Sequence, residues 1–211
     1  MPRDRKIVVF DLDGTILAST PFYFSILDKI FHRHQMVLTD EEKALASGLS
    51  AKAFLAPRLD ESAVNSALDY LKEQSAIDLH HIPVFDGFYG VLETLKLQGR
   101  KIAVWTSRDR SSALTLLARN QLDKFFDVVV AADCVKKHKP DPEGLFAIAE
   151  QLGGTTTDMV MIGDHDVDVM AARAAGVDVI RANWHGYRQG ENCRFGALTA
   201  HSVNDLTMHL T

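Results

Sequence analysis

The stretch Ile7-Val8-Val9-Phe10-Asp11-Leu12-Asp13-Gly14-Thr15 decides the fold. Its first four residues form an uninterrupted apolar run, which indicates a strand buried on both faces, as in a parallel sheet covered by helices. Two acids and a glycine follow, and open α/β sheets bind their ligands where such strands end. Because Asp-Gly is also an ordinary turn signal, the rest of the chain must distinguish a turn from a functional site.

Composition and charge narrow the class of protein. The 211 residues are 46% hydrophobic and 24% charged, which is typical of one globular domain or of a core with an insert. The net charge is −5 without a basic block, so we expect neither nucleic acid nor a membrane as partner. Cys134 and Cys193 lack metal-type spacing. No signal peptide or membrane-spanning run is evident, and we expect a soluble, cytoplasmic protein, monomeric or homodimeric.

Residues 17–82 show helical periodicity and no convincing strand. Thr39 to Glu42 predicts a capping box in which Glu42 reaches back, Ser50 can cap a short helix, and a longer helix is expected over about 60–74. We therefore expect a small helical domain over 17–82, inserted into a core formed by residues 1–16 and 83–211.

From Phe85 onward, apolar runs alternate with helical patterns. Further strands are predicted at 101–105, 128–130, 159–162 and 177–180. Asp141 is expected to cap the helix that follows it, with Pro142 at the first helical position. Strands separated by helices of this length imply a parallel sheet with right-handed crossovers. The predicted fold class is α/β, with a Rossmann-like parallel core and an inserted α-helical cap.

Polar residues follow several of these strands. They are Asp11 and Asp13, Thr106 and Ser107, and Asp164 with Asp168 beyond it, while Lys139 lies in the loop after the third strand. Each has an ordinary alternative, such as a surface lysine or a helix N-cap. Parallel strands, however, bring their carboxyl ends to one edge of the sheet, so we expect these groups to meet there.

Such a set suits phosphoryl transfer. Clustered carboxylates repel one another, and a hard divalent cation such as Mg²⁺ relieves that repulsion. A hydroxyl, backbone amides and a lysine suit a phosphate group. One carboxylate can attack phosphorus, and a second, Asp13, can protonate the leaving oxygen and later deprotonate water.

Four motifs resemble those of the haloacid dehalogenase-like superfamily in order and spacing. They are Asp11-Leu12-Asp13-Gly14-Thr15, Thr106 after its strand, Lys139-Pro140-Asp141-Pro142 and Gly163-Asp164-His165-Asp166-Val167-Asp168. Met170 to Gly176 and Trp184-His185-Gly186-Tyr187 are similar to the subgroup that includes phosphoglycolate phosphatases. The resemblance extends from Ile7 to Leu206, and it implies a magnesium-dependent phosphatase that acts on small phosphate esters through an aspartyl-phosphate.

The resemblance also implies roles for single residues. Asp11 would be nucleophile and metal ligand, Asp13 acid/base and metal ligand through its backbone carbonyl, and Asp164 a metal ligand. Thr106 and the Ser107 amide would bind phosphate. Lys139 would neutralise nucleophile and phosphate, and Asp168 would orient Lys139 or a metal-bound water.

Three further residues are weaker candidates for substrate contact. Gly48 and Lys52 lie where related enzymes carry a substrate-reading loop, and His165 stands where a small hydroxyl residue often follows the metal-binding acid. His165 can equally be a packing or hydrogen-bonding histidine.

Other functions compatible with these motifs are a sugar phosphomutase of the beta-phosphoglucomutase type, a 2-haloacid dehalogenase and a non-catalytic phosphate-binding protein. A dehalogenase needs no leaving-group acid, so Asp13 speaks against it. A mutase must protect its phosphoenzyme from water, and the expected cap of this chain lacks a recognisable loop for that. The complete polar set speaks against a non-catalytic module.

Overall fold

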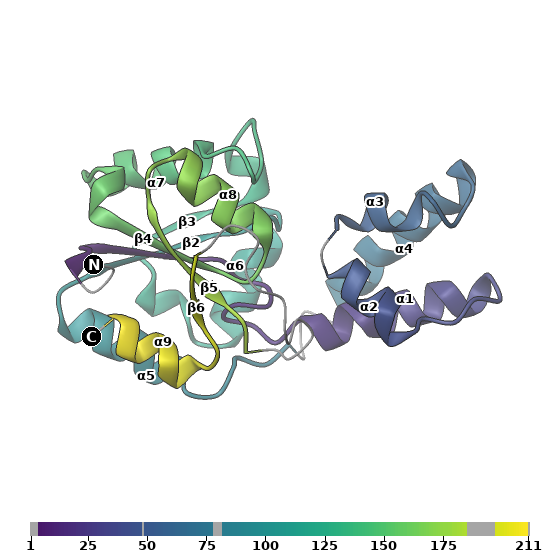
Figure 1. Cartoon of the computed structure of the whole chain (residues 1–211), viewed down its shortest axis with the longest axis horizontal. Coiled ribbons are helices and arrows are strands. Elements are labelled where there is room, and N and C mark those ends of the chain that lie inside the picture. Colours follow the sequence, from purple (N-terminus) through teal and green to yellow (C-terminus); the bar gives the residue numbers. More distant parts are fainter. Residues whose placement is uncertain (1–3, 48, 78–81, 185–196, 211) are drawn as a thin grey trace. The chain divides into compact units, whose positions relative to one another are not determined.

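The structure is a computed structural model, and it describes residues 4–47, 49–77, 82–184 and 197–210. The chain divides into two compact units (Figure 1). The sheet unit comprises Met1–Ala18 and Pro83–Thr211, and the helical unit comprises Ser19–Ile82. Within the described ranges, no helix is both long enough and apolar enough to span a membrane.

The sheet unit contains a six-stranded sheet in the order β3-β2-β1-β4-β5-β6, in which every pair of neighbours is parallel. The strands are β1 (Ile7–Phe10), β2 (Lys101–Trp105), β3 (Val128–Val130), β4 (Met159–Gly163), β5 (Asp178–Ala182) and β6 (Leu198–Ala200). The predicted α/β class with a parallel, Rossmann-like sheet is confirmed.

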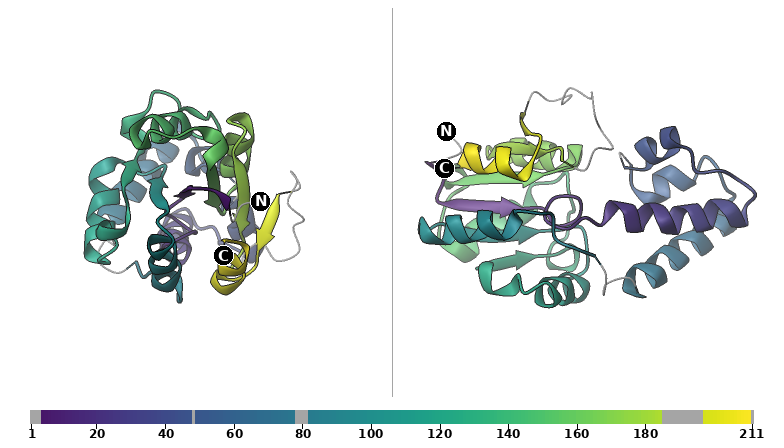
Figure 2. Two further views of the ribbon diagram at one scale, coloured as in Figure 1. Left: turned by 90° about the vertical axis from the view of Figure 1, so that its left-hand side faces the viewer. Right: turned by 90° about the horizontal axis from the view of Figure 1, so that it is seen from below.

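Helices cover both faces of this sheet (Figures 1 and 2). They are α5 (Phe88–Leu97), α6 (Arg110–Arg119), α7 (Glu143–Leu152), α8 (Asp166–Ala174) and α9 (Val203–Leu210), with short 3₁₀ turns η3 (Asp123–Phe125), η4 (Ala132–Cys134) and η5 (Thr156–Asp158). Successive side chains of β1 alternate between the faces. Ile7 and Val9 pack with α7 and α8, whereas the Phe10 ring meets Phe88 of α5 edge to face at 5.3 Å. Burial of β1 on both sides explains its unbroken apolar sequence.

The helical unit has its own core. It consists of α1 (Thr20–Arg33), α2 (Asp40–Ala46), α3 (Ala51–Leu55) and α4 (Glu61–Ile77). Phe31 of α1 stacks on Phe54 of α3 at 5.7 Å between ring centroids, and Leu71 of α4 belongs to the same cluster. No strand occurs in this unit over the ranges 19–47 and 49–77. The apolar stripes of these helices therefore pack against one another.

Two predicted helix starts need correction. The Thr39 hydroxyl accepts from the Glu42 N–H as expected, but the Glu42 carboxylate pairs with Arg58 at 2.6 Å instead of reaching back. A nearby guanidinium is the stronger partner for a carboxylate. At α7 the cap is Pro142, one residue later than predicted, although the Asp141 carboxylate still accepts from the N–H of Glu143.

Other differences concern element ends and exposed residues. The helix predicted over 60–74 extends to Ile77, and the last predicted strand begins and ends later, at Asp178–Ala182. Phe146 of α7, although apolar, is 50% exposed. Neither β6 nor α9 was predicted.

Candidate active site

The carboxyl ends of three adjacent strands bring the polar residues together. β1 lies between β2 and β4, with Phe10 opposite Val104 and Ile162. Asp11, Thr106 and Asp164 each follow the last residue of one of these strands. The loop between η4 and α7 adds Lys139. The sheet topology thus places together the four motifs that the sequence separates.

Lys139 occupies the buried side of this site. Its ammonium lies 2.7 Å from Asp11 Oδ1 and 2.8 Å from Asp168 Oδ1, and it donates to the Trp105 carbonyl at 2.7 Å. The ammonium hydrogen-bonds Asp11 Oδ1 and the Trp105 carbonyl, and it forms an ion pair with Asp168 Oδ1. The side chain is 2% exposed. Lys139 therefore fixes two carboxylates, and its donors are engaged before any phosphate binds.

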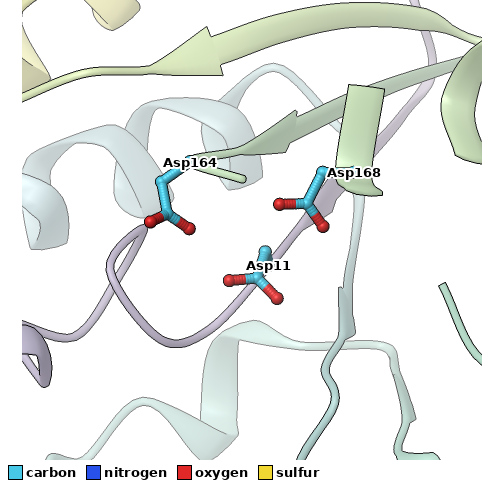
Figure 3. Close-up of side chains that lie close together, drawn as sticks. All are labelled: Asp11, Asp164 and Asp168. Atoms are coloured by element: carbon cyan, nitrogen blue, oxygen red, sulfur yellow. The ribbon is translucent and has the colours of Figure 1, made fainter. Parts of the chain in front are cut away.

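The carboxylates of Asp11, Asp164 and Asp168 gather at this site (Figure 3). One oxygen from each lies within 4.8 Å of the others. The Thr15 hydroxyl lies 3.5 Å from an oxygen of Asp11 and 3.5 Å from one of Asp164, and thus sits between these two acids. One ammonium leaves negative charge in excess, and hard oxygen donors suit a divalent cation. This acidic cluster is compatible with metal binding.

Asp168 differs from the other two acids. One of its oxygens pairs with Lys139, and the other accepts from the His165 N–H at 3.0 Å. These bonds fix the carboxylate at the start of α8. The structure places Asp168 where it orients Lys139, while Asp11 and Asp164 remain the better candidates for metal ligands.

Burial and charge act on Asp11 and Lys139 in opposite ways. Burial raises the pKa of the Asp11 carboxyl well above its usual value; Lys139 opposes this effect, and Asp168 and Asp164 reinforce it. Burial alone would lower the pKa of Lys139, but its carboxylate partners raise it, so the ammonium stays charged. A cation bound at the acidic cluster would favour the ionised form of Asp11.

Glycine is required at two positions that border the acids. Gly14 has φ +77°, and a Cβ there would lie 2.5 Å from Asp164 Oδ2. A Cβ on Gly163 would lie 2.4 Å from Asp168 Cγ. Both backbones approach a carboxylate more closely than any side chain allows.

Asp13 lies on the same edge and has a partner that the sequence did not reveal. Arg108 Nε lies 2.6 Å from Asp13 Oδ2, and Arg108 Nη2 lies 2.7 Å from Asp13 Oδ1. Burial alone would lower the pKa of Arg108, but the Asp13 carboxylate raises it. The only sequence signal was a basic residue two positions after Thr106.

The predicted phosphate-binding turn follows β2. Thr106 is 2% exposed; its hydroxyl accepts from the backbone N–H of Arg108 at 3.1 Å, and its own backbone N–H donates to the Val130 carbonyl. A hydroxyl that accepts can still donate its own proton. Ser107 is exposed. This turn leaves a hydroxyl donor at the site edge.

The three weaker candidates have different positions. His165 is the N-cap of α8, and its Nδ1 accepts from the Val167 N–H at 3.3 Å. Asp164 itself is therefore not the N-cap of α8. Lys52 is exposed on α3 of the helical unit, and Gly48 lies outside the described residues.

The family is shown by a sequence comparison. A model of the haloacid dehalogenase-like hydrolases matches residues 8–182. The chain belongs to the haloacid dehalogenase-like hydrolases. The residues matched include the acids after β1 and β4 and the lysine loop, so the family assignment and the local geometry agree.

Relatives of this hydrolase carry phosphatase names. A pyrophosphatase of Halalkalibacterium halodurans is 32% identical over 81% of this chain and 80% of its own. A phosphoglycolate phosphatase of Rhodospirillum rubrum is 32% identical over 92% of this chain and 85% of its own. These relatives confirm the predicted class, a haloacid dehalogenase-like hydrolase of the phosphatase type.

A solved structure agrees in fold. A candidate beta-phosphoglucomutase of Thermotoga maritima superposes with a TM-score of 0.72 at 25% identity, covering 92% of this chain and 93% of that one. The haloacid dehalogenase-like fold thus extends over nearly the whole chain.

Proposed function

We propose that this hydrolase cleaves small phosphomonoesters in a magnesium-dependent reaction, through an aspartyl-phosphate on Asp11. One observation carries the proposal. The Asp11 carboxylate is held by Lys139 at the end of β1, and Asp13, Thr106 and Asp164 lie on the same edge of the sheet. Relatives named as phosphoglycolate phosphatase and pyrophosphatase support the substrate class.

In the first step, an Asp11 oxygen attacks the phosphorus atom while Asp13 donates a proton to the leaving oxygen, so that an alcohol departs. In the second step, Asp13 takes a proton from water, which attacks the phosphorus atom of the acyl phosphate and releases inorganic phosphate and Asp11. The same side chain thus acts first as acid and then as base.

The other residues hold charge and position. The Thr106 hydroxyl and the Ser107 N–H are assigned to phosphate oxygens, and Lys139 keeps Asp11 in place and balances the incoming negative charge. Asp11, Asp164 and the Asp13 backbone carbonyl are the proposed Mg²⁺ ligands. The ion would offset the charge that gathers on the phosphoryl oxygens.

The direct test uses p-nitrophenyl phosphate. We expect turnover that EDTA abolishes and that added Mg²⁺ restores, and we expect none from Asp11→Asn. Asp69→Asn, at an exposed position of the helical unit, should retain the wild-type rate. Activity that survives chelation contradicts the metal assignment, and an active Asp11→Asn variant contradicts the nucleophile.

A phosphomutase remains the second candidate, because a similar structure is described as a candidate beta-phosphoglucomutase. It would form the same phosphoenzyme but transfer the group back to a sugar phosphate. Incubation with a sugar phosphate and a bisphosphate activator separates the two functions. An isomerised sugar phosphate identifies the mutase, whereas inorganic phosphate identifies the phosphatase.

A further inference from the structure

Arg108 is a charged residue beside Asp13, the proposed acid/base. The reaction proposed above gives Arg108 no role. Its guanidinium binds both oxygens of Asp13, at 2.6 and 2.7 Å. Among the residues that the structure describes, no other acceptor of this guanidinium is found. The side chain is 18% exposed and that of Asp13 33%. The pair is thus partly open to an incoming molecule.

This pair competes with the leaving oxygen for the Asp13 carboxylate. An acid/base group must come within hydrogen-bond distance of the leaving oxygen, and each Asp13 oxygen already accepts one hydrogen bond from Arg108, which leaves only the remaining lone pairs for the substrate. Separating the pair leaves a largely buried guanidinium without a counter-charge, which is unfavourable unless another anion replaces the carboxylate. The pair is therefore expected to open readily only with a substrate that supplies such an anion.

The position of Arg108 fits an anion on the leaving group. The backbone N–H of Arg108 donates to the Thr106 hydroxyl at 3.1 Å. Arg108 therefore belongs to the turn that is proposed to bind phosphate. When Asp13 contacts the leaving oxygen, a guanidinium in contact with Asp13 lies about 5–6 Å from that oxygen. An anionic group attached one or two atoms beyond the leaving oxygen falls within this reach.

We propose that Arg108 binds a second anionic group of the substrate, and that this group replaces Asp13 as partner of the guanidinium and frees Asp13 for proton transfer. The inference rests on the proposed phosphatase function and deepens it. The planar guanidinium fork matches a carboxylate or a phosphoryl group in two-point contact. The preferred substrates are therefore phosphate esters or anhydrides with such a group next to the leaving oxygen.

The test compares two esters of nearly equal shape, phosphoglycolate and its primary amide, in which the carboxylate becomes neutral. For the wild type, we expect kcat/KM to be roughly 10- to 100-fold higher with phosphoglycolate than with its amide, because loss of the charged partner of a hydrogen bond weakens the interaction by about that factor. Arg108→Gln should reduce this preference at least fivefold, and Arg108→Lys, which keeps the charge but loses the fork, should fall between the two. Arg119→Gln, at an exposed position of α6, is the matched control and should keep the wild-type preference.

The possible outcomes distinguish a failure of this inference from a failure of the proposed phosphatase function. A wild type that cleaves both esters equally well overturns the role of Arg108 but leaves the phosphatase standing. A wild type that cleaves neither ester, p-nitrophenyl phosphate nor pyrophosphate overturns the function itself, and the inference with it. If Arg108→Gln lowers both rates by the same factor, Arg108 only orders the turn and the inference is wrong. If Arg108→Gln does not fold, Arg108→Lys decides: a preference equal to that of the wild type contradicts the inference.

Discussion

Lys139 joins groups from three different parts of the sheet edge. It contacts Asp11 after β1, the Trp105 carbonyl at the end of β2 and Asp168 in α8. Its position over the Trp105 ring, 4.9 Å from the centroid, adds a cation–π contact. A residue proposed for catalysis is thus also a structural residue.

Replacing Lys139 by methionine should therefore cost stability as well as activity. Removing one partner of a buried ion pair is strongly unfavourable, and we expect the free energy of unfolding to fall by about 3–5 kcal/mol. Urea denaturation measures this loss. Lys101→Met is the control, because that lysine is 57% exposed and its pair with Asp127 is worth at most about 1 kcal/mol. Equal losses in the two variants would refute the structural role.

The candidate site was predictable from the sequence where a residue follows a strand directly. Asp11, Thr106 and Asp164 could be placed because parallel strands end at one edge. The Asp13–Arg108 pair could not, since it depends on side-chain directions across 95 positions of sequence. The hydrogen-bonding alternative for His165 is borne out, but its position as N-cap could not be identified, because histidine is not a common N-cap residue.

Among the elements, β2, β3 and α5 are tied together by one carboxylate. Asp127 precedes β3 and binds Lys96 of α5 at 2.8 Å, Lys101 of β2 at 3.2 Å and the Ile102 N–H at 2.9 Å. Burial alone would raise the pKa of Asp127, but these bonds lower it. The carboxylate therefore stabilises the fold in its ionised form.

This linkage gives a pH-dependent prediction. Asp127→Asn should lower the free energy of unfolding by roughly 1 kcal/mol at pH 7, because the pair is largely solvent-screened. The pKa of Asp127 is lower in the folded state than in the unfolded state, where it is about 3.9. The ionised carboxylate therefore contributes stability above about pH 3.9, and this contribution disappears as the pH falls through the folded-state pKa. The gap between wild type and variant in urea titrations should thus be smaller at pH 3 than at pH 7. Asp123→Asn, exposed in η3, should show no gap at either pH; a gap for Asp127→Asn that is unchanged at pH 3 would contradict the linkage.

Element prediction succeeded where a strand carries an apolar, β-branched run and failed where it does not. β1 and residues 102–105 of β2 are continuous apolar segments buried in the sheet. β6 has only Leu198, Thr199 and Ala200, of which Leu198 is 43% exposed, so its sequence carries almost no strand signal. Such an edge strand is fixed by pairing with β5, which a local pattern cannot reveal.

At the scale of the whole molecule, the residues of the proposed reaction lie in one unit of the chain and the inserted helices form the other. The acids, the lysine and the turn proposed to bind phosphate all belong to the sheet unit. We propose that the helical unit serves as a substrate-selecting cap. The sheet unit holds an excess of carboxylates over cations at its edge, which leaves the metal-free protein with unfavourable repulsion.

Binding of Mg²⁺ should therefore stabilise the folded protein apart from any effect on rate. A ligand that binds only the native state raises the stability by an amount that grows with its concentration. We expect the melting temperature to rise with MgCl₂, and Asp164→Asn to lose this rise. Asp69→Asn should retain it. A rise that persists in Asp164→Asn would place the ion elsewhere.

Trapping of the phosphoenzyme tests the central role of Asp11 most directly. The protein is mixed with Mg²⁺ and a phosphomonoester, quenched in acid within milliseconds, and treated with borohydride, which reduces an acyl phosphate to an alcohol. Peptide mass spectrometry then locates the reduced residue. We expect reduction at Asp11 only when substrate is present. Reduction at another residue, or none during active turnover, would contradict the proposed mechanism.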